Sequence, residues 1–160
     1  MRHNFVAAAM LAITLATAVF GQSDFHTYPV RTITALIDMH SDEASRKADI
    51  AVSANPFPSK SVVTFAGEHR AVEKAKKDFM ELWFQTKGVE KERAELLLEE
   101  YKFTENGTDH WLPVIKDLVP FVEKELKKGD KIEIYFFFLG GYGGKGAKKW
   151  VLAVEEFKKM

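Results

Sequence analysis

The chain has 160 residues, enough for one domain, and its 23 basic and 23 acidic residues give no formal net charge. This balance argues against a nucleic-acid-binding protein and against one drawn to anionic membranes, because both classes usually carry an excess of basic residues. The chain has no cysteine, which excludes disulfides and cysteine catalysis, and its 13 phenylalanines indicate a bulky aromatic core.

The first residues have the layout of a secretory signal peptide. Arg2 and His3 precede residues 5–20, which carry no charge, and small residues are close to the end of this run. The run is shorter than the roughly 20 residues that a membrane-spanning helix needs. We therefore expect cleavage, after Ala18 or Gly21, rather than retention as an anchor.

These observations predict a signal peptide at residues 1–21 and a single α+β domain at residues 22–160. The expected protein is periplasmic or secreted, with no stable membrane span after cleavage. Small secreted domains are often rich in disulfides. A cysteine-free domain of this length favours a protein of the bacterial cell envelope with a conventional hydrophobic core.

The first part of the mature chain predicts three strands. Residues 28–37 alternate apolar residues with threonines, and residues 49–54 and 61–66 are rich in β-branched or apolar residues. A polar stretch at residues 39–48 predicts a short helical turn. Residues 55–59 predict a loop, because two prolines remove backbone donors.

Three helices are predicted next, at residues 68–87, 90–101 and 109–128. Each range places apolar residues at helical spacing along one face. The pair Asn106-Gly107 predicts a turn between the second and third helices. Pro120 is expected to kink the third helix.

The last segment predicts an antiparallel hairpin. Residues 131–139 and 149–157 read as strands joined by a glycine-rich connection at residues 140–147. Phe136, Phe137 and Phe138 make the first strand apolar on both faces, which is typical of a central strand. The order of elements predicts an α+β fold, with a mainly antiparallel sheet of four to five strands packed against about three helices.

The glycine-rich connection is the first candidate for ligand or partner contact. It matches G-x-G-x-x-G, but the segment after it predicts a strand, whereas dinucleotide binding needs a helix there. A second hypothesis is an anion-binding loop, because residues 131–160 hold six lysines against three glutamates and glycine turns can form nests of N–H groups. The residues assigned to this contact are Gly141, Tyr142, Gly143, Gly144, Lys145, Lys148 and Lys149.

A second candidate is the polar cluster of Asp38, His40 and Asp42. A carboxylate beside an imidazole can transfer protons or bind a metal, but the cluster offers too few ligands for a metal site. The sequence therefore predicts no metal and no cofactor. No serine lies in a nucleophile elbow, so the sequence gives no sign of nucleophilic catalysis.

These observations favour a non-catalytic binding or interaction module of the bacterial cell envelope. The expected partner is an envelope protein or a small ligand, and not a nucleic acid. The alternative is a small hydrolase or isomerase with a dispersed site that uses Asp38, His40 or His110. A more remote alternative is a secreted protease or lysozyme inhibitor that acts through the glycine-rich connection.

Because the signal peptide is expected to be removed on export, the native protein should be shorter than the encoded chain. N-terminal sequencing of material from the native host should begin at residue 19 or 22, because signal peptidase cuts after small residues. A native protein that keeps Met1 in the cytosol would contradict this expectation.

Overall fold

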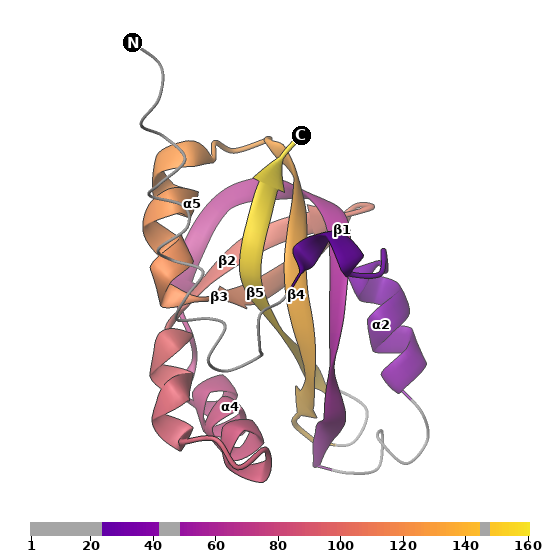
Figure 1. The fold of residues 1–160 in the computed structure, drawn as a ribbon, viewed down its shortest axis with the longest axis vertical. Helices are drawn as coiled ribbons and strands as arrows, with labels where there is room; N and C mark the ends of the chain where they lie inside the picture. Colours follow the sequence, from indigo (N-terminus) through magenta and orange to yellow (C-terminus); the bar gives the residue numbers. More distant parts are fainter. Residues whose placement is uncertain (1–23, 42–48, 145–147) are drawn as a thin grey trace.

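A computed structural model describes residues 24–41, 49–144 and 148–160, with only the backbone of residues 54–57 (Figure 1). The predicted signal peptide at residues 1–21, together with Asp42 and Lys145 of the two candidate sites, lies outside the described residues.

Five strands close into a barrel in the order β1-β2-β3-β5-β4. The strand bounds are β1 Ile50–Ala71, β2 Glu99–Glu105, β3 Thr108–Val114, β4 Lys131–Tyr142 and β5 Lys149–Lys159. All neighbours are antiparallel except β3 and β5. Because β4 returns to pair with β1, four of the strands have the 4-1-2-3 order of a Greek key. A five-stranded Greek-key barrel is also the architecture of the OB-fold, which hosts many unrelated functions, so the architecture alone assigns none.

Short helices cover the outside of the barrel. The connection from β1 to β2 holds α4 (Lys74–Thr86) and the 3₁₀ helix η2 (Lys91–Leu96). The connection from β3 to β4 holds η3 (Lys116–Leu118) and α5 (Val119–Glu125). Before β1 come η1 (Phe25–Thr27) and α2 (Ile33–His40). Figure 1 shows α4 and α5 on one side of the barrel and α2 on the opposite side.

The aromatic strand β4 lies at the centre of the packing, as the sequence predicts. It pairs with both β1 and β5, and Phe136, Phe137 and Phe138 are almost fully buried. The predicted antiparallel hairpin of this strand with β5 is confirmed. The α+β class is also confirmed, but the sheet closes into a barrel instead of forming one layer against the helices.

Two of the predicted helices are wrong. Residues 90–101 form η2 and then enter β2, and residues 109–128 begin with β3 before η3 and α5. The cause is the turn between them: Asn106 and Gly107 both have positive φ, at 50° and 83°, as a two-residue type I′ hairpin turn requires. This turn pairs Glu105 with Thr108, so it joins strands rather than helices.

The N-terminal predictions are also corrected. The strand predicted at residues 28–37 is wrong, because α2 starts at Ile33, where the Thr32 hydroxyl accepts a hydrogen bond from the Ala35 N–H at 3.1 Å. The loop predicted at residues 55–59 lies within β1, whose register against β4 shifts between Val52 and Phe57. Because β1 continues to Ala71, the helix predicted from residue 68 starts only at Lys74.

A buried carboxyl group attaches α2 to the barrel. Glu105, at the end of β2, is 2% exposed and accepts hydrogen bonds from the Ile33 N–H at 2.9 Å and the Thr34 N–H at 3.2 Å. It also accepts one from the Ser61 hydroxyl at 2.6 Å. The first N–H groups of a helix have no partner inside the helix, so Glu105 satisfies them from a distant part of the chain.

The variant Glu105→Ala should lower the free energy of unfolding by about 2–3 kcal/mol, because it leaves several buried donors without an acceptor. Urea unfolding measures the change. Glu99→Ala, at the other and partly exposed end of the same strand, is the matched control and should change stability by about 0.5 kcal/mol or less. Equal effects of the two variants would show that Glu105 does not anchor α2.

Candidate functional site

The strands β3 and β5 form one ladder pair among the described residues, Val114 with Val154. The Ile115 N–H donates to the Val154 carbonyl at 3.0 Å beside this pair. The pair lies at the C-terminal end of β3, so the preceding part of β3 has an edge that β5 does not cover. The barrel wall is therefore open between the first halves of the two strands.

The backbone of β3 explains where the pairing stops. In an antiparallel pair, alternate residues direct their backbone groups toward the partner strand and away from it. The Ile115 N–H donates to β5, and the Trp111 carbonyl accepts a hydrogen bond from Lys76. Trp111, Pro113 and Ile115 are alternate residues, so all three direct their backbone groups away from β2. Pro113 has no N–H, so this edge lacks the donor that would continue the ladder.

The opening in the wall is a cavity of about 300 Å³. It is lined by β3, β5, the start of α4, the end of β1 and Ile37 of α2. Leu112 and Leu152 in its lining are buried in the core, whereas Trp111 lies on the other face of β3 and is partly exposed. The cavity thus crosses the wall, and its volume lies at the lower end of the usual range for small-ligand sites.

Two cations around one buried carboxylate form the outer part of the site. Glu100 of β2 is fully buried and accepts from Arg70 Nε at 2.6 Å and from Lys76 Nζ. Lys76 lies on the inner face of α4 and also donates to the Trp111 carbonyl at 3.3 Å. Because a buried carboxylate is stable only when it is paired, Glu100 holds both cations at the cavity.

Arg70 is oriented from two sides. Its guanidinium carbon lies 4.1 Å from the centre of the Trp111 ring, and its Nε is fixed by Glu100. The side chain is nevertheless 51% exposed. The site therefore presents a pre-oriented cation to solvent, with the remaining guanidinium nitrogens outside the contact with Glu100.

A second ion pair lies at the start of α4. Glu73 accepts from Lys149 Nζ at 2.8 Å and from the Tyr142 hydroxyl. The hydrogen bond from Lys149, followed by that from Tyr142, lowers the pKa of Glu73. Burial, followed by the contact with Glu73, raises the pKa of Tyr142. These contacts join the end of β4 and the start of β5 to α4, and they hold Lys149 at the cavity with Tyr142 behind Glu73.

His110 forms the inner part of the site. It is opposite Phe103 on the inward face of β3, and its buried Nε2 has no hydrogen-bond partner among the described residues. Burial lowers the pKa of His110, against the opposing effects of Glu105 and Asp109. Burial therefore favours the neutral imidazole, whose Nε2 is closed to solvent in this structure.

The residues of the predicted glycine-rich contact lie partly in β4 and partly after it. Gly141 and Tyr142 belong to β4 rather than to a loop, whereas Gly143 and Gly144 follow its end. A side chain at Gly141 would meet Trp150 at 2.8 Å and Lys148 at 2.9 Å, so this glycine is needed for close packing. Of the described residues assigned to this contact, Lys149 alone lines the cavity, and Tyr142 reaches it through Glu73.

The two described residues of the second predicted cluster, Asp38 and His40, do not line the cavity. His40 Nδ1 lies 2.8 Å from the Leu36 carbonyl oxygen, and its ring stacks on Phe138 with centroids 4.2 Å apart. Asp38 is exposed on the same helix. In the described ranges, no group of three or more histidines and carboxylates is placed to hold a metal ion.

Sequence reasoning missed the cluster of Arg70, Lys76 and Glu100. These residues look like members of solvated helix faces in a chain that is 29% charged. One signal was present: Lys76 is three residues before Phe79 and four before Met80, so it shares the buried face of α4. A lysine on an apolar helix face needs a buried acidic partner, but the sequence does not show which one.

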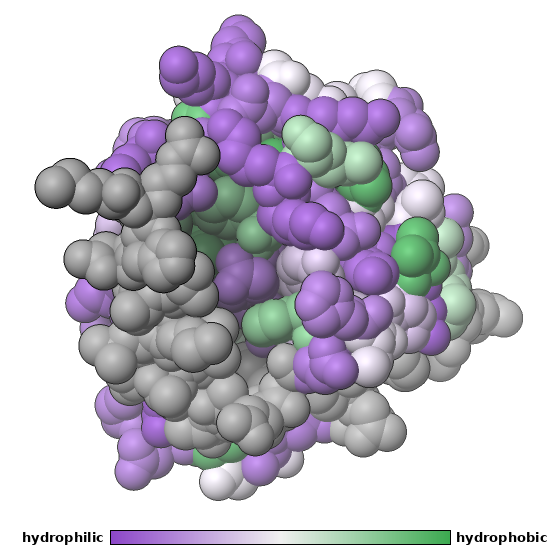
Figure 2. Space-filling model, turned by 45° about the horizontal axis from the view of Figure 1, so that its top comes forward, coloured by the Kyte–Doolittle hydropathy of each residue, from purple (hydrophilic) through white to green (hydrophobic). Residues whose placement is uncertain are grey.

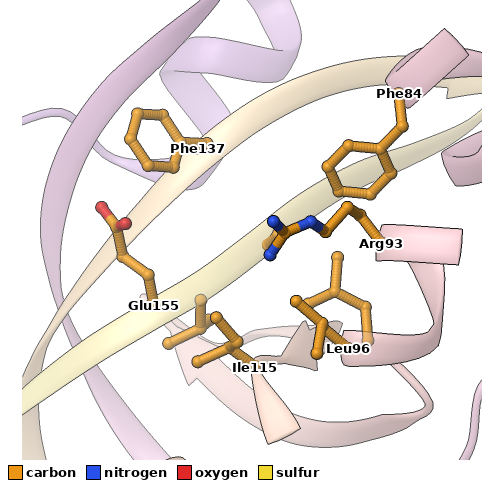
Figure 3. A pocket seen from close by; sticks show the side chains of 9 residues that line it. Phe84, Arg93, Leu96, Ile115, Phe137 and Glu155 are labelled. Atoms are coloured by element: carbon orange, nitrogen blue, oxygen red, sulfur yellow. The ribbon is translucent and has the colours of Figure 1, made fainter. Parts of the chain in front are cut away.

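A second, smaller cavity holds a buried carboxyl group (Figure 3). Its volume is about 20 Å³, room for one water molecule. Figure 3 shows Arg93 and Glu155 entering it from opposite sides. The Tyr28 hydroxyl donates to Glu155 at 2.5 Å, but burial dominates and raises the pKa of Glu155 to about 8.

The described part of the chain contains no helix that is both long and apolar enough to cross a membrane. In comparisons with known proteins, no family model matches the chain and no curated protein matches it. By its fold and its site, the protein is a small Greek-key barrel with a charged cavity across its wall.

The buried Glu155 should make the protein less stable as pH rises. The folded state keeps this proton up to about pH 8, whereas the unfolded chain releases it near pH 4.5, so stability falls between these values. The slope from this group is at most about 1.4 kcal/mol per pH unit. Urea unfolding from pH 5 to pH 8 should show a steeper loss of stability in the wild type than in Glu155→Gln, and the difference isolates Glu155 because the opposing slope from the lowered pKa of His110 is common to both.

Some slope should remain in Glu155→Gln, because burial also raises the pKa of Glu156. The exposed Glu90→Gln is the matched control and should keep the wild-type slope. Identical slopes in wild type and Glu155→Gln would rule out a buried protonated Glu155.

Proposed function

We propose that this chain is an exported, non-catalytic binding module of the cell envelope, and that its ligand site is the cavity between β3 and β5. The observation that carries the proposal is the pre-oriented Arg70, stacked on Trp111 at a cavity of ligand size. Orienting a charged side chain before binding lowers the entropy cost of binding. The layout of the first 21 residues supports export.

The surface favours a small ligand over a protein partner. A protein-binding face usually has a contiguous apolar patch of several hundred Å². The large hydrophobic residues that are exposed in the described chain are spread along the sequence, with only Ile50 and Val62 in one element, β1: Val30, Met39, Ile50, Val62, Leu98 and Met160. On the face seen in Figure 2, hydrophilic side chains cover most of the described surface, and hydrophobic ones form small separate areas.

The composition of the cavity favours binding over nucleophilic catalysis. None of its described lining residues is a serine, threonine or cysteine. Its two lining carboxylates are held in contacts of their own, Glu73 with Lys149 and Asp109 with Lys102. The two lining lysines are paired as well, Lys76 with Glu100 and Lys149 with Glu73, and such contacts hold charged side chains in place rather than activate them for attack.

A screen of small molecules tests the proposal through intrinsic tryptophan fluorescence and thermal unfolding. A ligand present at 100 times its Kd should stabilise the fold by about 2.7 kcal/mol and change the emission of Trp111 or Trp150, which line the cavity. Trp111→Ala should weaken binding by about tenfold, because it removes the ring that supports Arg70.

Leu98→Ala, a change at an exposed residue outside the cavity, is the matched control and should bind like the wild type. A screen without hits, or hits that bind Trp111→Ala as tightly as the wild type, would overturn the cavity as the ligand site.

A further inference from the structure

The chemistry of the cavity also identifies a class of ligand, an inference that rests on the proposed function. We infer that the ligand is a small organic anion with a flat apolar body, whose anionic group binds at Arg70 and whose distal hydroxyl group reaches His110.

The outer end of the cavity has more donors than acceptors. A guanidinium has five N–H donors and an ammonium has three. In the described contacts, Arg70 uses its Nε for Glu100, and Lys149 makes one hydrogen bond, to Glu73. Both side chains are at least half exposed, so several donors face solvent at the mouth. A carboxylate, which offers only acceptors, matches these donors.

A cationic ligand does not fit the same end. The face of Trp111, where a ligand cation would bind, is covered by Arg70 at 4.1 Å, and Lys102 lies 5.9 Å from the same ring. The carboxylates are also engaged: Glu100 binds two cations, and Asp109 binds Lys102 and the Thr104 hydroxyl. Like-charge repulsion with Arg70 and Lys76 would therefore oppose a cation, with no carboxylate left to offset it.

The middle of the cavity is apolar and partly aromatic. Trp150, Leu112, Leu152 and Ile37 line it, and Trp150 is fixed against Phe138 with ring centroids 5.6 Å apart. Flat rings pack well against such a surface. A volume of about 300 Å³ limits the ligand to a small molecule and leaves no room inside for a polymer.

The inner end of the cavity is lined by His110, whose Nε2 is closed to solvent, so a ligand pairs with this atom once the imidazole turns toward the cavity. His110 Nε2 is buried without a partner among the described residues, and the neutral imidazole can donate or accept there, depending on its tautomer. A hydroxyl group can match either role. Because an unpaired buried polar atom is costly, a ligand that pairs with His110 should bind more tightly than one that lacks the hydroxyl.

Isothermal titration with three hydroxylated aromatic acids of increasing length tests this inference: 4-hydroxybenzoate, 4-hydroxyphenylacetate and 4-hydroxycinnamate. At least one acid should bind, and its neutral amide should bind at least about tenfold more weakly, because a charge-assisted hydrogen bond to Arg70 is lost. The acid without the hydroxyl should also bind more weakly, by about fivefold or more.

Variants of Arg70 and His110 test the two expected ligand contacts separately. Arg70→Gln should weaken the acid about tenfold and leave the amide unchanged, whereas Arg70→Lys should recover part of the difference because it keeps the charge. His110→Phe should remove the preference for the hydroxylated acid. Lys74→Gln, an exposed cation outside the cavity, is the control and should bind like the wild type. Thermal unfolding of each variant verifies that it folds.

The outcomes separate this inference from the proposed function. Amides that bind as tightly as acids, or an Arg70→Gln variant that folds and binds the acid normally, would overturn the anion assignment and leave a neutral ligand in the same cavity. If none of the acids binds, the anion assignment is overturned, while hits in the broader screen that depend on Trp111 would still support a ligand site here.

Discussion

The closure of the barrel through a single β3–β5 ladder pair, Val114 with Val154, is the constraint from which the site follows. Had the two strands paired along their length, their edges would have been joined by hydrogen bonds and no cavity would cross the wall. Pro113 removes the next donor, and Lys76 occupies the Trp111 carbonyl instead. A lysine and a proline at an open edge also oppose pairing with a strand of another chain.

Charged side chains line the opening in the barrel wall, next to the apolar core. Glu100 is buried between a strand and a helix, and it is stable there because Arg70 from the end of β1 and Lys76 from α4 both bind it. The insertion of α4 between β1 and β2 therefore does more than cover the barrel. It supplies the cation that lets Glu100 hold Arg70 over Trp111, so the packing of one helix sets the geometry of the mouth.

Sequence reasoning reached the parts of this fold that local patterns determine. The aromatic run of β4 and its hairpin with β5 are visible as alternation, and Tyr142 and Lys149 near the end of that hairpin do reach the site. The hairpin of β2 and β3 was missed because its apolar residues also fit a helical spacing, and the Asn106-Gly107 signal decides between the two only when it is read as a type I′ turn. The contacts of Glu100 and of Glu105 join residues 24 to 72 positions apart, which no local pattern reveals.

Amide hydrogen exchange along β3 tests the open wall most directly. The account predicts that the His110 and Leu112 amides, which face β2, are protected, while the Trp111 amide between them exchanges much faster because it faces the cavity. A Trp111 amide as strongly protected as its two neighbours would mean that β3 is paired on both sides, and it would contradict a cavity across the barrel wall.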